Sequence, residues 1–185
     1  MTRPDGNHRY AWGMDAHAFY HYLTLARRDL WAALRAVPEA DLARPLIDTD
    51  GARCVKDLVA HIPVVEDGWF RGDLLGVPFV MERFRPEPQS ADEYWHHQDE
   101  PLEDLLAYWE AVEADTLERW PALMEVAASG RRVKVDDSRP ETFTADEAMW
   151  HVMQHEVRHS AQIVLLLRML GHRPPSLDLV FLVAH

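Results

Sequence analysis

Residues 144–171 read TADEAMWHVMQHEVRHSAQIVLLLRMLG and predict one long helix without a break. Thr144 and Glu147 have the spacing of a capping box, in which each side chain accepts a hydrogen bond from the other residue's backbone N–H, so they mark its start. Gly171, followed by prolines at 174 and 175, marks its end, because glycine favours the turn after a helix and proline cannot continue one. The helix between these signals is the most strongly specified element of the chain.

Three histidines of this helix, His151, His155 and His159, follow one another at four-residue intervals and therefore project from one side. The same stripe continues as Gln162 and then as apolar residues, so this side faces the core. An unpaired polar group in a core costs about 1–3 kcal/mol, so buried imidazoles need hydrogen-bond partners or a metal ion. The pattern predicts a polar or metal-binding site inside the fold.

Three further amphipathic helices are predicted at about residues 15–37, 55–75 and 101–120, from apolar residues at three- and four-residue steps. We expect the second of these to kink or break at Pro63, beside His61, because proline removes a backbone donor and crowds the preceding turn. Four long helices with connections able to cross the molecule predict an all-α four-helix bundle, a fold that binds metals between facing helices.

The connections are predicted from shorter patterns. Residues 76–88 hold three prolines without a period, which indicates a loop. Residues 131–137 alternate and are expected to form a short extended arm, paired with residues 141–144. The apolar tail, residues 177–185, is expected to fold back on the bundle as a short helix.

Composition limits the class of protein. At 185 residues the chain has the length of a single domain, which we expect to span residues 1–185. A net charge of −12, from 19 Lys and Arg against 31 Asp and Glu, disfavours nucleic acid and anionic membranes as partners. A single cysteine, no signal-peptide pattern and no apolar run of membrane-spanning length together predict a cytoplasmic protein.

The predicted second helix offers a third imidazole, since His61 lies at the edge of its apolar stripe. Two histidines four residues apart, joined by one from a facing helix, give three nitrogen ligands and leave a position for water or substrate. We therefore predict His61, His155 and His159 as metal ligands. His151 is predicted to line the pocket beside them, with core packing as the alternative.

Residues 155–159, HEVRH, also match the H-E-x-x-H motif, in which two histidines bind zinc and the glutamate is the base of a metallopeptidase. The motif is short enough to arise by chance. A peptidase also needs an edge strand for its substrate, for which a mostly helical chain offers little. A metallopeptidase is thus the less favoured alternative.

The segments HVMQHEVRHSAQI (151–163) and VKDLVAH (55–61) resemble the motifs of the DinB-like superfamily of damage-inducible bundle proteins. The resemblance implies an up-down-down-up bundle, a histidine triad that binds nickel, zinc or a similar divalent ion, and frequently a homodimer. Ser160 and Ala161 stand where the family commonly has Arg-Gly. The wider superfamily includes mycothiol-dependent maleylpyruvate isomerase and bacillithiol transferases.

From these features we expect a metal-dependent enzyme, a transferase or a hydrolase, that activates a low-molecular-weight thiol or water for transfer to a small electrophile. Glu156 is a candidate base, although it projects about 100° around the helix from His155. Gln162 is a candidate for orienting a ligand or bound water. The alternatives are a non-catalytic metal-binding, stress-related protein and a bundle without metal.

Overall fold

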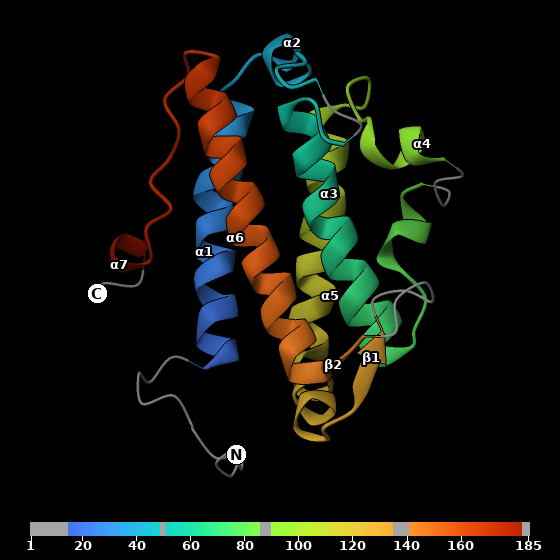
Figure 1. Cartoon of the computed structure of the whole chain (residues 1–185). Helices are drawn as coiled ribbons and strands as arrows, with labels where there is room; N and C mark the ends of the chain where they lie inside the picture. The colour runs from blue at the N-terminus through green and yellow to red at the C-terminus, as the bar shows by residue number, and fades with distance from the viewer. Residues whose placement is uncertain (1–14, 49–50, 86–89, 135–140, 183–185) are drawn as a thin grey trace.

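Four long helices form an up-down-down-up bundle in the computed structural model, which confirms the predicted all-α class (Figure 1). The structure describes residues 15–48, 51–85, 90–134 and 141–182. The four helices are α1 (Ala16–Arg35), α3 (Val55–Asp67), α5 (Leu102–Ala128) and α6 (Ala145–Met169). Helix α6 packs against the other three, and α3 packs against α5, so α3 and α6 face each other across the interior.

The shorter elements join or cover the bundle. They are α2 (Glu39–Leu42), the 3₁₀ helix η2 (Val80–Arg83), α4 (Ala91–Trp95), α7 (Leu179–Leu182) and the strands β1 (Arg132–Lys134) and β2 (Thr142–Thr144). The strands pair antiparallel, with Val133 opposite Phe143, as the alternating pattern predicted. The sequence predicts that the tail folds back on the bundle as a short helix, and α7 confirms this for residues 179–182. The rest of the expected arm, residues 135–137, and of the tail, residues 183–185, lies outside the described residues.

Two proline positions differ from expectation. Helix α3 continues through Pro63 and becomes a π-helix, η1 (Gly68–Leu75), only further along, so the break expected beside His61 is wrong. Every residue from 54 to 63 is buried, and this packing holds the helix together through the proline. Helix α5 likewise runs through Pro121 to Ala128 and is longer than predicted.

The capping signal predicted at Thr144 is observed. Thr144 Oγ1 accepts from Glu147 N at 3.2 Å and starts α6 as predicted. Ser90 Oγ accepts from Glu93 N at 3.1 Å and starts the short helix α4. A separate segment therefore lies between α3 and α5 in the chain.

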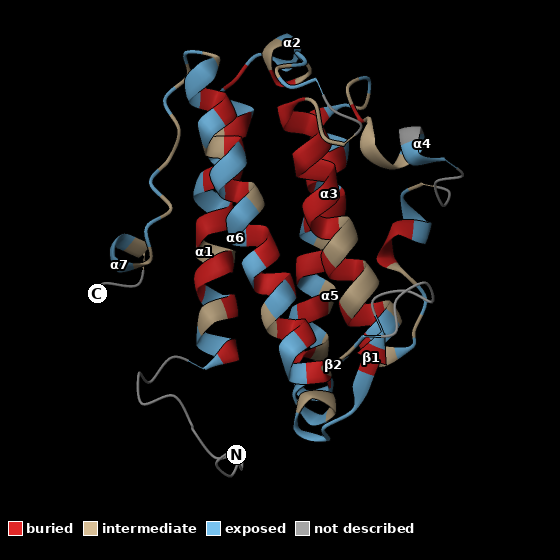
Figure 2. Cartoon of the chain, viewed as in Figure 1, coloured by how far each residue is buried: buried red, intermediate tan, exposed pale blue. Residues whose placement is uncertain are grey.

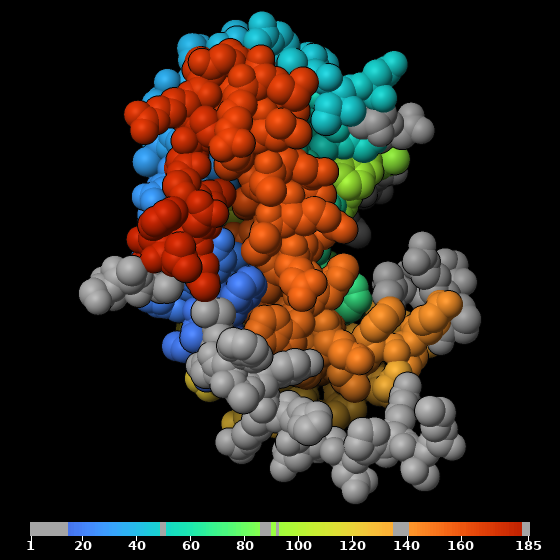
Figure 3. Space-filling model, turned by 60° about the vertical axis from the view of Figure 1, so that its left-hand side comes forward, coloured from blue at the N-terminus to red at the C-terminus, as the bar shows by residue number. Residues whose placement is uncertain are grey.

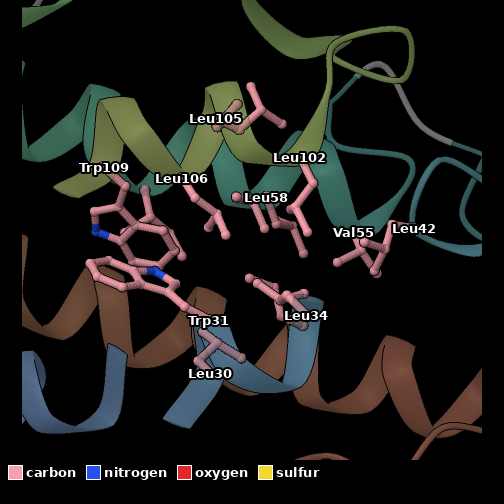
Figure 4. Close-up of a cluster of buried hydrophobic side chains, with 14 of the residues drawn as sticks. Leu30, Trp31, Leu34, Leu42, Val55, Leu58, Leu102, Leu105, Leu106 and Trp109 are labelled. Carbon is pink, nitrogen blue, oxygen red and sulfur yellow. The ribbon is translucent and has the colours of Figure 1, made fainter. Parts of the chain in front are cut away.

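Apolar side chains fill the space between the helices, and the buried residues of the four helices face inward while the exposed ones face outward (Figure 2). One cluster lies towards α2 and joins Leu30 and Trp31 of α1, Leu58 of α3 and Trp109 of α5 (Figure 4). A second cluster lies at the opposite end and includes Tyr20, Leu23, Phe70, Trp120, Met149 and Met153. Among the described residues, no helix is both long and apolar enough to cross a membrane.

A buried group of charges, here called the Arg27 network, links all four long helices. The guanidinium of Arg27, 1% exposed, donates from Nε and Nη2 to the two carboxylate oxygens of Glu156 at 2.8 and 2.6 Å. It also donates to Glu66 Oε2 at 2.6 Å and to Glu113 Oε2 at 3.1 Å. Tyr20 and Thr116 donate their hydroxyls to Glu66 Oε1. Each carboxylate therefore has a partner in the core.

Replacing Arg27 with methionine is expected to lower the free energy of unfolding by about 3–5 kcal/mol, because it leaves buried carboxylates without their counter-charge. Urea titration followed by circular dichroism measures the change. Arg35→Met is the matched control on the same helix: its partners Glu103 and Glu110 are exposed, so a loss below about 1 kcal/mol is expected. Equal losses in the two variants would contradict a special role for the network.

Candidate metal centre

The packing of α3 against α6 brings three histidines together. One ring nitrogen each of His61, His155 and His159 lies within 4.8 Å of the others, and Nε2 of His61 is 3.1 Å from Nε2 of His155. His61 and His155 are each 7% exposed, whereas His159 is only half-buried. The three residues predicted as ligands thus form one group, which is buried on one side and reaches the surface on the other.

The spacing of these nitrogens fits a tetrahedral metal site. Bonds of about 2.0–2.1 Å from zinc to imidazole nitrogen place two ligand atoms about 3.4 Å apart. The 3.1 Å between Nε2 of His61 and Nε2 of His155 and the upper limit of 4.8 Å for the whole group lie on either side of that value, so small side-chain adjustments suffice. Nδ1 of His61 is buried and has no hydrogen-bond partner among the described residues. Three imidazoles suit zinc, nickel, copper and iron alike, so the geometry does not select one metal.

Electrostatics keep these imidazoles neutral, which is the form that binds metals. Burial, reinforced by the neighbouring His159 and Arg158, lowers the pKa of His61 to about 3. Burial and the neighbouring histidines lower the pKa of His155 to about 2. The pKa of His159 is also lowered, mainly by burial. At neutral pH no proton has to be displaced from the two buried ligands.

Gln162 lies one turn beyond His159 and contacts it directly. The distance from Nδ1 of His159 to Oε1 of Gln162 is 2.5 Å, so the ring donates Nδ1–H to the amide oxygen. This hydrogen bond fixes the tautomer that leaves Nε2 with its lone pair. Ligating histidines commonly have such a partner, which sets the orientation of the ring.

Glu156 and His151 lie apart from the three histidines. Both carboxylate oxygens of Glu156 accept hydrogen bonds from Arg27, so the glutamate of the H-E-x-x-H pattern points into the Arg27 network. This geometry does not support the metallopeptidase alternative, whose base has to face the metal. His151 is exposed and packs against Trp69, with the ring centroids 5.5 Å apart, while its ring lies 6.2 Å from that of His155.

Two aromatic residues that the sequence analysis did not single out cover His61. The ring of Trp95 lies 4.5 Å from the imidazole of His61, and the ring of Tyr94 packs edge-on at 5.9 Å. Both belong to α4. Sequence spacing gives no sign of this contact, because it depends on how a short separate helix folds back against α3.

The start of α3 holds the segment that follows α4. Oδ1 of Asp57 accepts from the backbone N–H of His97 at 2.8 Å, while its Oδ2 accepts from Arg53 N at 2.7 Å. Lys56 Nζ donates to the carbonyl of Gln98 at 3.0 Å. Lys56 and Asp57 therefore fix the chain just beyond Trp95 and, with it, the aromatic cover of His61.

Fold and site together define a class of protein: a helical bundle with a three-histidine group between two of its long helices. The model of the DinB family matches residues 10–184, and the chain belongs to this family. The resemblance in the two histidine-containing motifs is thereby confirmed. A search of curated proteins finds no match to the chain.

The free energy of unfolding of the metal-free protein is expected to fall between about pH 7 and pH 5.5. Histidines of the unfolded chain, with pKa values near 6.5, take up protons there, whereas folded His61 and His155 stay neutral until about pH 3 and 2. The unfolded state binds more protons, so each histidine lowers the free energy by up to about 1.4 kcal/mol per pH unit. Urea titrations of chelator-treated protein measure the slope.

The double variant His61→Leu/His155→Leu is the control for this pH dependence. It lacks both imidazoles, so its free energy of unfolding should change less steeply over the same range. A slope equal to that of the wild type would show that the two histidines are not held neutral in the fold.

Proposed function

We propose that this DinB-family protein binds one divalent metal ion through His61, His155 and His159 and is a metal-dependent enzyme. Its reaction is the transfer of a low-molecular-weight thiol, or of water, to a small electrophile. The observation that carries the proposal is the group of three imidazole nitrogens within 4.8 Å. Because His159 is half-buried, a small molecule can reach the group from the surface.

A bound divalent ion would lower the pKa of a thiol or water molecule in its remaining position and so supply the nucleophile near neutral pH. The chain's own residues have distinct tasks around it. His61 and His155 present neutral nitrogens, and Gln162 holds the ring of His159. Trp95 covers His61 and excludes water from that side. Glu156 is occupied by Arg27, which leaves no free base at this position.

The second candidate is a non-catalytic metal-binding protein involved in a stress response. It would use the same three histidines, so turnover alone distinguishes it from the enzyme. The structure offers one feature in favour of turnover, namely the access to His159 from the surface, since a purely structural ion is normally enclosed by four protein ligands.

Elemental analysis of tag-free protein, purified without chelating resin, is expected to give about one divalent ion per chain. His155→Ala and His159→Ala should lose the ion, because two imidazoles hold it too weakly. His151→Ala is the matched control on the same helix and should keep it. Wild-type protein without metal, even after addition of zinc, nickel or manganese, would refute the proposal.

The metal found is then used in a screen of small thiols against a model electrophile. Turnover that disappears in His159→Ala and persists in His151→Ala would support the proposal that the protein is a metal-dependent enzyme. Full metal loading without turnover across the panel would favour the non-catalytic candidate instead.

We also propose that the protein forms a homodimer through the outer face of α6. Leu165 and Met169, respectively 55% and 59% exposed, lie one turn apart and form an apolar stripe near the C-terminal end of this helix, beyond the turn that carries Arg158. The helix runs along the surface of the molecule beside the C-terminal segment (Figure 3). Apolar stripes of this kind on a surface commonly mark an interface.

Light scattering or sedimentation is expected to show a dimer that Leu165→Glu converts to a monomer, because a charge in the apolar stripe is costly to bury. Leu117→Glu is the control, since Leu117 is exposed on α5, away from this face. A monomeric wild type, or a dimer that survives Leu165→Glu, would refute this interface.

A further inference from the structure

An arginine lies beside the three histidines where a divalent cation would bind. Nη2 of Arg158 is 3.5 Å from Nε2 of His159, the nitrogen left free by the contact with Gln162. The side chain is exposed, and no carboxylate among the described residues pairs with it. Arg27, Arg35 and Arg71 each contact at least one carboxylate, whereas Arg158, like Arg168 further along α6, has none among the described residues; only Arg158 lies at the histidines.

Arg158 carries a permanent positive charge beside the three histidines. A fixed positive charge at this distance opposes the binding of a metal cation. A negative group between the guanidinium and the ion would offset this repulsion.

We propose that Arg158 is a substrate-binding residue that holds a carboxylate on the small molecule taking the open metal position. This inference rests on the proposed function and names the class of its ligand: a thiol, or an electrophile, that carries a negative charge. A guanidinium suits this task because its planar N–H groups match the two oxygens of a carboxylate.

The surroundings of the site are consistent with a ligand of mixed character. Arg158 contacts His159 at the surface, whereas Trp95 and Tyr94 lie against the buried His61. A ligand bound at the histidines would therefore meet a positive charge on the solvent side and aromatic rings beside His61.

The test uses Co²⁺ as the metal and two small thiols of similar size, anionic 3-mercaptopropionate and neutral 2-mercaptoethanol. The visible absorption of Co²⁺ reports occupation of the metal site, and the sulfur-to-cobalt charge-transfer band reports thiolate binding. Arg158→Gln should weaken the binding of 3-mercaptopropionate about tenfold and that of 2-mercaptoethanol less than about twofold. Arg158→Lys keeps the charge and should restore part of the difference.

Arg168→Gln is the control, since Arg168 is an exposed arginine on α6 about 15 Å further along the helix. It should bind both thiols as the wild type does. If Arg158→Gln binds Co²⁺ but keeps its full affinity for 3-mercaptopropionate, or weakens both thiols equally, the inference is refuted and the metal centre stands. If the wild type shows no Co²⁺ absorption, the metal centre itself fails, and the inference falls with it.

Discussion

One buried guanidinium constrains the whole bundle. Arg27 of α1 has to reach carboxylates on α3, α5 and α6 at once, and none of these helices can slide without leaving a charge unpaired in the core. Two of the three acceptors lie close to the histidines in sequence: Glu66 follows His61 by five residues, and Glu156 follows His155 directly. The contacts that pair these charges therefore also hold α3 and α6 in register. In this register, Nε2 of His61 lies 3.1 Å from Nε2 of His155.

Adjacent residues of α6 serve different parts of the interior. Successive side chains of a helix point about 100° apart, so His155 faces α3 while Glu156 faces Arg27. The same angle separates these two residues in a metallopeptidase, so it is the pairing of Glu156 with Arg27 that distinguishes this chain from such an enzyme. In such an enzyme the glutamate is free to take a proton from water, whereas here both of its oxygens accept hydrogen bonds from a cation.

The parts of the structure that follow from local spacing were predictable. The four-residue interval between His155 and His159, the cap at Thr144 and the stripe containing His61 depend on neighbours along one helix, and they predicted the bundle and the histidine group. Features that depend on packing between distant segments could not be predicted in this way. They are the buried partners of Arg27, the contact of Trp95 with His61, and the continuation of α3 through Pro63. In each case the deciding energy comes from burial against another helix, which outweighs the local preference.

Two groups of polar residues lie in the interior, the Arg27 network and the three histidines. The network is closed to solvent, whereas the histidine group is open to it on one side. In the Arg27 network, Arg27, Glu66, Glu113 and Glu156 are at most 4% exposed and bonded to one another, which suits a rigid structural element. The histidine group instead keeps an unpartnered Nδ1 on His61, a half-buried His159 and a guanidinium without a carboxylate partner among the described residues. The Arg27 network therefore fixes the four helices relative to one another, and the proposed metal and its ligand would bind at the histidine group.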